Sequence, residues 1–250
     1  MTIGSLEWAA TSSGNLSNAE RLRLLAPILR TTATYTAGRL RMLFGLRPAR
    51  VGALDLERLV LPDSKLVAEA LREYRETLTP SMQNHSLRTF AFGLALANLD
   101  GVQLDVEQFY VASLLHDLAL ESPTPNRCFA VVGAERALAI ARRAGADDEA
   151  ARAIAEGICM HVTPGVGFER GPIGPMLSAG ALVDLAGVRL WDLDPAFARA
   201  AEGRHPRLAM KRHLTACWSA EARAVPGGRA AFIARYAAFS LFVRLAPFRE

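Results

Sequence analysis

Apolar side chains recur at helical spacing along almost the whole chain, and this periodicity constrains the fold more than any other feature. Between Pro62 and Pro80, six apolar residues fall on one face of a helix: Leu66, Val67, Ala70, Leu71, Tyr74 and Leu78. No segment shows the alternation of apolar and polar residues that is typical of a half-buried strand. The sequence therefore predicts an all-α fold.

Capping and breaking residues divide this pattern into elements. Ser17-Asn-Ala-Glu20 is a capping-box pattern that opens an N-terminal helix, in which Pro27 is a candidate kink, and Asp105-Val-Glu-Gln108 opens another. The Gly- and Pro-rich residues 163–175 are expected to form a loop that closes over a pocket. Further helices are expected over residues 85–98, 105–117, 131–144, 147–161, 175–187, 195–203, 206–223 and 228–246. We expect a helical arm over 1–50 and a helical domain over 51–250.

Composition limits the classes of function. Of 250 residues, 51% are hydrophobic, which is enough for one large core, and no apolar run reaches the roughly 18 residues needed to span a bilayer. We see no secretory signal, and three widely spaced cysteines predict reduced thiols in a cytoplasmic protein. The basic segment 39–50 is interpreted as a solvated helix end, so the net charge of +4 does not predict a nucleic-acid partner.

His116 and Asp117 are the residues most indicative of chemistry. They stand side by side at the end of an otherwise apolar helix, among Leu114, Leu115 and Leu118. Burying an imidazole and a carboxylate there is costly unless a partner satisfies both groups. A metal ion is such a partner, although His-Asp is also a common dipeptide.

Three further polar residues are predicted to face the same core. His85 begins one helix, His161 follows Ile154 and Ile158 at helical spacing, and Asp184 lies on the apolar stripe of another helix. Each has a simpler explanation: a buried histidine often has only a structural hydrogen bond, and a buried aspartate often pairs with an arginine, for which Arg189 is a candidate. Arg88, one turn after His85, is either a solvated charge or a group that holds an anion.

The order His, His-Asp, His, Asp resembles that of the HD superfamily of metal-dependent hydrolases. The similar stretches are Asn84-His-Ser-Leu-Arg-Thr-Phe90, Leu114-Leu-His-Asp-Leu-Ala119, the helix of His161 and Leu182-Val-Asp-Leu-Ala-Gly187. The first, together with residues 129–134, looks most like the branch that contains cyanamide hydratase. Two positions depart from the pattern: Ala119 replaces a common Gly, and Ala130 stands where that branch carries Glu.

The resemblance implies an HD-type helical bundle and a set of roles. His85, His116, Asp117 and Asp184 would bind one divalent metal, with zinc or iron favoured and manganese also compatible. Asp117 and His161 would carry catalysis, His161 as a proton donor or as part of a second metal position. Arg88 would contact the substrate.

The most favoured function is a hydrolase or hydratase that uses a metal-activated water on a small polar molecule, either a phosphate ester or a small nitrile. The alternative is a non-catalytic sensor or scaffold that keeps the HD shell and uses the basic arm as its contact surface. A third interpretation, a DNA-binding protein, is supported by the positive charge alone. His205 and His213 are interpreted as surface residues, and the aromatic C-terminal segment as core or as the interface of a homo-oligomer.

Overall fold

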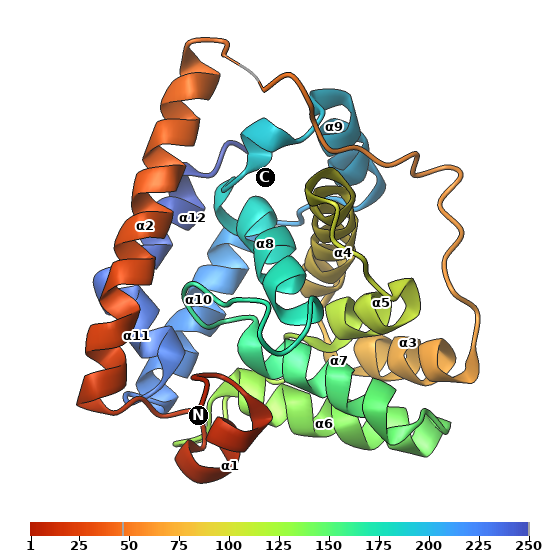
Figure 1. The fold of residues 1–250 in the computed structure, drawn as a ribbon, viewed down its shortest axis with the longest axis vertical. Coiled ribbons are helices and arrows are strands. Elements are labelled where there is room, and N and C mark those ends of the chain that lie inside the picture. The colour runs from red at the N-terminus through yellow and green to blue at the C-terminus, as the bar shows by residue number, and fades with distance from the viewer. Residues whose placement is uncertain (47, 250) are drawn as a thin grey trace.

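The computed structural model describes residues 1–46 and 48–249, and these residues are almost entirely helical (Figure 1). They contain no named β-strand, so the predicted all-α class is confirmed. One 3-10 turn, η1 (Leu190–Asp192), accompanies the α-helices. The α-helices are α1 (Leu6–Ser12), α2 (Asn18–Leu43), α3 (Lys65–Thr77), α4 (Pro80–Asp100), α5 (Val106–Leu115), α6 (Phe129–Ala144), α7 (Asp148–Met160), α8 (Ile173–Ala186), α9 (Pro195–Arg204), α10 (Met210–Ala224), α11 (Arg229–Tyr236) and α12 (Phe239–Leu245).

Local side-chain caps explain where several helices begin. At the start of α2, the Ser17 hydroxyl accepts a hydrogen bond from the Glu20 amide, and the Glu20 carboxylate accepts one from the Ser17 amide, so the predicted capping box is confirmed. At α5 only half of the predicted box forms. Asp105 caps the amide of Gln108, whereas the Gln108 side chain contacts the Asp105 carboxylate instead of its backbone.

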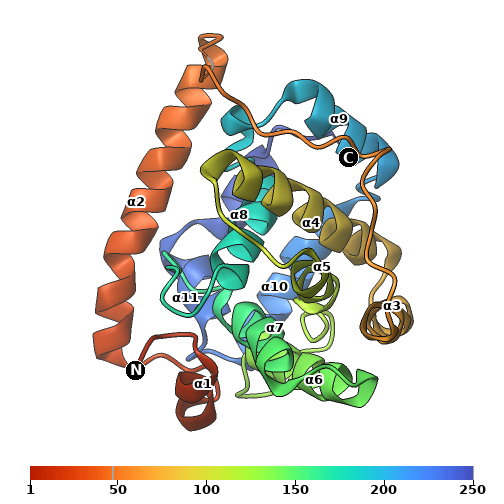
Figure 2. The same cartoon turned by 45° about the vertical axis from the view of Figure 1, so that its right-hand side comes forward.

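Helices α4 and α8 form the centre of the molecule and lie side by side (Figures 1 and 2). Helix α4 is buried on all sides from Ser86 to Ala97 except at half-buried Leu87, which is the pattern of a core helix. Glycines allow the two helices to approach closely, because a Cβ atom on Gly180 would lie 2.2 Å from the carbonyl oxygen of Thr89. This contact holds one predicted ligand helix against another.

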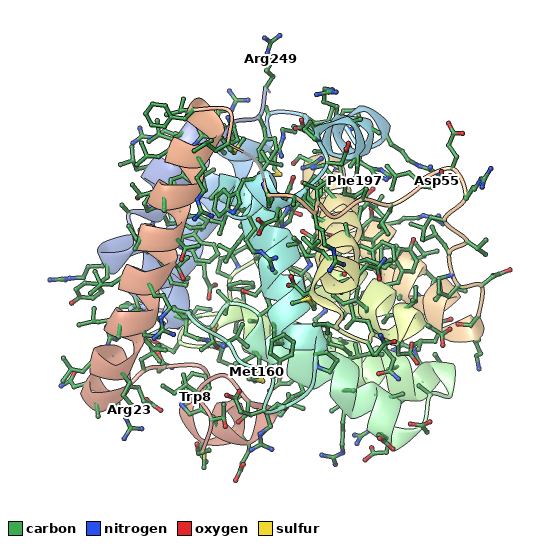
Figure 3. All side chains as sticks on the ribbon, turned by 45° about the horizontal axis from the view of Figure 1, so that its top comes forward. Trp8, Arg23, Asp55, Met160, Phe197 and Arg249 are labelled. Atoms are coloured by element: carbon green, nitrogen blue, oxygen red, sulfur yellow. The ribbon has the colours of Figure 1, made fainter. Side chains whose placement is uncertain are left out.

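Helices α5, α6 and α7 pack against this centre from one side. Helix α7 contacts α5, α6 and α8, and α5 contacts α3 and α4. As a result, the C-terminal ends of α5 and α7 both point toward the middle of the bundle, where His116 and His161 are their C-cap residues. Met160, labelled in Figure 3, is the last residue of α7.

Helix α2, in the predicted arm, lies along the bundle rather than apart from it. Figure 1 shows it as the long helix beside α11 and α12. It runs through Pro27 as one element, and the ring of Trp191 packs where Gly38 has no side chain. The short helix α1 at its base was not predicted. Arg23 of α2 extends into solvent (Figure 3), whereas Leu24 and Ile28 are buried.

The C-terminal helices differ from the prediction. The single helix expected over 228–246 is two helices, because the backbone of Ala238 has a positive φ of 47° and ends the regular hydrogen bonding. The break turns Phe239 onto Trp218, with their rings stacked 4.1 Å apart. The helix expected from residue 206 begins only at Met210, since Leu208 and Ala209 also have positive φ.

Two expectations concern the molecule's surroundings. No helix among residues 1–46 and 48–249 combines the length and the apolar character that crossing a bilayer would require. Part of the basic segment 39–50 belongs to the exposed end of α2, and Arg47 lies outside the described residues.

Candidate metal centre

The predicted site residues meet at the centre of the bundle. His85 comes from the second turn of α4, His116 and Asp117 follow α5, His161 follows α7 and Asp184 lies in α8. All five are buried. Residues that are up to 99 positions apart in the sequence are thus brought into one cluster by helix packing.

Each of the three histidines is held through its Nδ1 atom. Nδ1 of His116 is 2.8 Å from the carbonyl oxygen of Ser113, and Nδ1 of His161 is 2.6 Å from that of Ile158. Nδ1 of His85 is 2.7 Å from Oδ2 of Asp184. Because each of these acceptors requires a donor, Nδ1 carries the hydrogen and Nε2 is left with its lone pair.

The two C-cap histidines repeat one local arrangement. Both occupy the residue after their helix, and both donate to the carbonyl three residues earlier. Carbonyls in the last turn of a helix lack an intrahelical donor, so the imidazole satisfies one of them and is fixed in orientation at the same time. The sequence alone did not indicate this motif.

Three of the resulting acceptor atoms form a nearly equilateral triangle. Nε2 of His85 and Nε2 of His116 are 3.4 Å apart, and Oδ2 of Asp117 lies 3.5 Å and 3.3 Å from them. Ligand atoms at the corners of a tetrahedron around zinc, each about 2.0–2.1 Å from the ion, are about 3.3–3.4 Å apart. The triangle therefore fits one face of such a site.

Asp117 is a buried carboxylate, and its charge would be balanced by a bound cation. Its only ion-pair contacts within the described part of the chain are to His85, His116 and His161. Burial alone would raise the pKa of Asp117, but the histidines outweigh burial and hold that pKa well below its usual range, so the carboxylate is charged. Burial acts to lower the pKa of His116, yet Asp117 raises it overall.

Asp184 is neutralised by protein groups. Its Oδ1 accepts hydrogen bonds from Arg88 and Arg207, each at 2.7 Å, and its Oδ2 accepts from His85 and from Arg88. Although burial raises the pKa of Asp184, the two guanidinium groups outweigh it and hold that pKa far below its usual range. Both oxygens are therefore occupied by donors. The candidate partner named from the sequence, Arg189, pairs instead with Asp100 and Asp192.

Arg88 is placed behind the cluster. It is completely buried, and its donors face Asp184 and the carbonyl of His205. It does not line the cavity described below. The predicted contact of Arg88 with substrate has no counterpart in this geometry, because its donors are used within the protein.

His161 lies on the far side of Asp117. Its Nε2 is 3.8 Å from Oδ1 of Asp117, and its ring meets that of His116 edge to face at 5.1 Å. Burial and the nearby His116 lower the pKa of His161 to about 3. The imidazole is therefore neutral near pH 7 and presents a lone pair.

A cavity of about 150 Å³ opens over this cluster. Its floor contains His85, His116, Asp117 and His161. Its walls come from α2, α8, α10, α11 and α12, and from residues 162–165 at the start of the loop that was expected to close over a pocket. This loop packs against the arm, where Gly165 approaches Pro27.

A second group of possible ligands lies nearer the surface. His213 Nε2 forms an ion pair with Glu121 and lies 3.6 Å from Sγ of Cys217. His213 is half-buried, rather than a free surface residue as interpreted from the sequence. Because its Nε2 is already paired with Glu121, which Thr79 also contacts, this group is explained by its own hydrogen bonds.

The fold and cluster define an all-α protein with a buried His/Asp centre of the kind that holds a divalent cation. Residues 82–188 match the family model of the HD domain, and this match supports the HD superfamily. HD domains bind divalent metals, and the matched segment contains every ligand predicted from the sequence. No curated protein matches the chain, so the resemblance to the cyanamide hydratase branch stays a prediction.

Proposed function

We propose that this protein is a metal-dependent hydrolase or hydratase, with one divalent ion held by His85, His116 and Asp117. The observation that carries the proposal is the triangle of acceptor atoms, 3.3–3.5 Å on each side, around a buried carboxylate that no arginine or lysine of the described chain neutralises. Two nitrogens and one oxygen suit zinc, iron or manganese. Three protein ligands leave a position for water, as in catalytic sites.

The bound ion would supply a water of lowered pKa. The protein's own groups would then organise the reaction. Asp117 offers Oδ2 to the ion and keeps Oδ1 directed toward His161. His161 lines the cavity with the Nε2 lone pair beside Asp117, and this placement supports a role in proton transfer to and from the substrate.

Asp184 and Arg88 act through other residues in this proposal. The sequence-based interpretation made Asp184 a fourth ligand, but both of its oxygens accept protein hydrogen bonds. We assign it the orientation of His85, since a carboxylate on Nδ1 fixes the imidazole that offers Nε2 to a metal. Arg88 and Arg207 hold Asp184 in place and balance its charge.

Elemental analysis of the purified protein tests the metal centre. We expect about one equivalent of zinc, iron or manganese in the wild type and none in the His116→Ala/Asp117→Ala double variant, because two of three ligands are removed. Asp184→Asn should weaken metal binding by about 10- to 100-fold, the usual effect of losing a group that orients a ligand. His161→Ala is the matched control and should retain the metal. A full equivalent of metal in the double variant would contradict the assignment of His116 and Asp117 as ligands.

A further inference from the structure

The cavity above the metal centre has predominantly apolar walls. Ile28 of α2, Leu182 and Leu185 of α8, Leu214 of α10 and Phe242 of α12 all face it. Apolar walls of this kind favour a ligand whose body is also apolar, because polar groups would lose their hydration there without gaining partners.

The described residues that form these walls include no arginine or lysine. Among the described residues that line the cavity, Asp117 is the only carboxylate. Three buried arginines lie nearby, but none of them lines the cavity. Arg88 and Arg207 donate to Asp184, and Arg229 donates to the carbonyl of Cys159 and the hydroxyl of Thr163. Sites that act on phosphoryl groups use arginine, lysine or several metal charges to balance the anion. One divalent ion beside Asp117 would leave a single net positive charge.

The arm contributes three of the hydroxyl-bearing side chains that line the cavity, and Thr163 and Ser178 supply two more. Ile28, Thr31, Thr32 and Tyr35 follow one face of α2 and line the cavity together. The hydroxyl groups of Thr31, Thr32 and Tyr35 are uncharged donors and acceptors. The ring of Tyr35 is packed edge to face on Phe242, with ring centroids 4.8 Å apart, which restricts its position. These groups suit a neutral polar substituent.

Size sets a further limit. An apolar cavity of roughly 150 Å³ holds a molecule of about the size of benzene. Resting on the proposed function, we propose that the substrate is an uncharged molecule with an apolar body of about one ring, and that phosphate esters are excluded. Of the two substrate classes considered from the sequence, this removes the anionic one.

Calorimetric titration of the purified protein with two matched probes tests this proposal. Benzamide and phenyl phosphate share one ring and differ in charge. We expect benzamide to bind at least about tenfold more tightly, because the cavity gives no counter-charge to the phosphate. Thr31→Trp should weaken benzamide binding by at least about tenfold by filling the cavity, whereas Thr34→Trp, on the exposed face of the same helix, should leave it unchanged.

Equal or tighter binding of phenyl phosphate would overturn the proposal, as would failure of benzamide to bind. The comparison of the two probes on the wild type decides this without any variant. Metal analysis of the same sample separates the proposed substrate class from the proposed metal-dependent function. Metal-loaded protein that prefers phenyl phosphate would refute the substrate class and leave the metal centre standing. Benzamide binding to protein that takes up no metal would support the cavity's preference while removing the proposed function.

Discussion

At the scale of single residues, the geometry of the site depends on how each imidazole is restrained. His116 and His161 are fixed by carbonyls of their own helices, and His85 by Asp184. The proposed ligand nitrogens of His85 and His116 are therefore positioned by the protein itself, which would lower the entropy cost of binding a metal. Asp117 supplies a negative charge beside these rings.

The stability of the metal-free protein should depend on pH through His161. The pKa of this residue falls from 6.5 to about 3 in the folded state. Between these pH values, His161 is therefore protonated in the unfolded chain and neutral in the folded chain. Between these values, stability falls as the pH falls. On going from pH 7 to pH 5, we expect His161 alone to lower the free energy of unfolding by about 2 kcal/mol. Urea unfolding of wild-type and His161→Gln protein at both pH values measures this cost. If the free energy of unfolding changed equally between pH 7 and pH 5 in the two proteins, the expectation would be contradicted.

At the scale of elements, the contact between α4 and α8 holds the His/Asp cluster together. His85 lies on one helix and Asp184 on the other, and their hydrogen bond of 2.7 Å requires the close approach that Gly93 and Gly180 permit. Hydrophobic helices could pack in several registers, so the glycine contact selects the register that joins these two residues.

Gly180→Ala should therefore be strongly destabilising. Its new Cβ would lie 2.2 Å from the Thr89 carbonyl, which is backbone and cannot move without separating the helices. We expect a loss of about 2–3 kcal/mol in the free energy of unfolding, together with weaker metal binding. Gly203→Ala in α9 is the matched control. A Cβ there meets nothing within 4 Å, and removing a helical glycine should stabilise the protein by up to about 1 kcal/mol. Denaturant unfolding of both variants measures the difference, and similar effects would refute the argument.

The difference between predicted and observed elements has a local cause. Helix starts were predictable where a side chain caps the backbone, as at Ser17 and Asp147. The break between α11 and α12 was not, because Ala238 has no intrinsic preference for a positive φ. The stacking of Phe239 on Trp218, which belongs to another helix, accompanies that conformation.

At the scale of the whole molecule, the metal centre and the cavity above it have different origins in the chain. The proposed ligands lie inside the matched segment 82–188, whereas Ile28 and Tyr35, and the residues from Leu214 to Val243, lie outside it. The arm and the C-terminal helices thus supply walls of the cavity, whereas the His/Asp cluster on its floor lies in the segment that matches the HD model. The walls would then determine which molecules reach a metal held by the proposed ligands.

Metal removal should destabilise the entire fold, because the ligands come from α4 and from the residue pair that follows α5. A ligand present at a hundred times its dissociation constant stabilises the folded state by about 2.7 kcal/mol. We expect a chelator to lower the Tm of the wild type by several degrees and to leave the His116→Ala/Asp117→Ala variant unchanged. Differential scanning calorimetry measures both, and an equal shift in the two proteins would show that the chelator acts elsewhere.

The sequence by itself determined the all-α class and the set of residues in the cluster, because helical periodicity and polar groups on apolar faces are local signals. Tertiary structure alone decided how those residues are used. Arg207 follows a proline and bears no local mark of function, yet packing places it on Asp184 and with Arg88 neutralises that carboxylate. Likewise, only the position of α2 against the bundle turns the arm into a cavity wall. Contacts between distant segments depend on helix packing, which one-dimensional spacing does not encode.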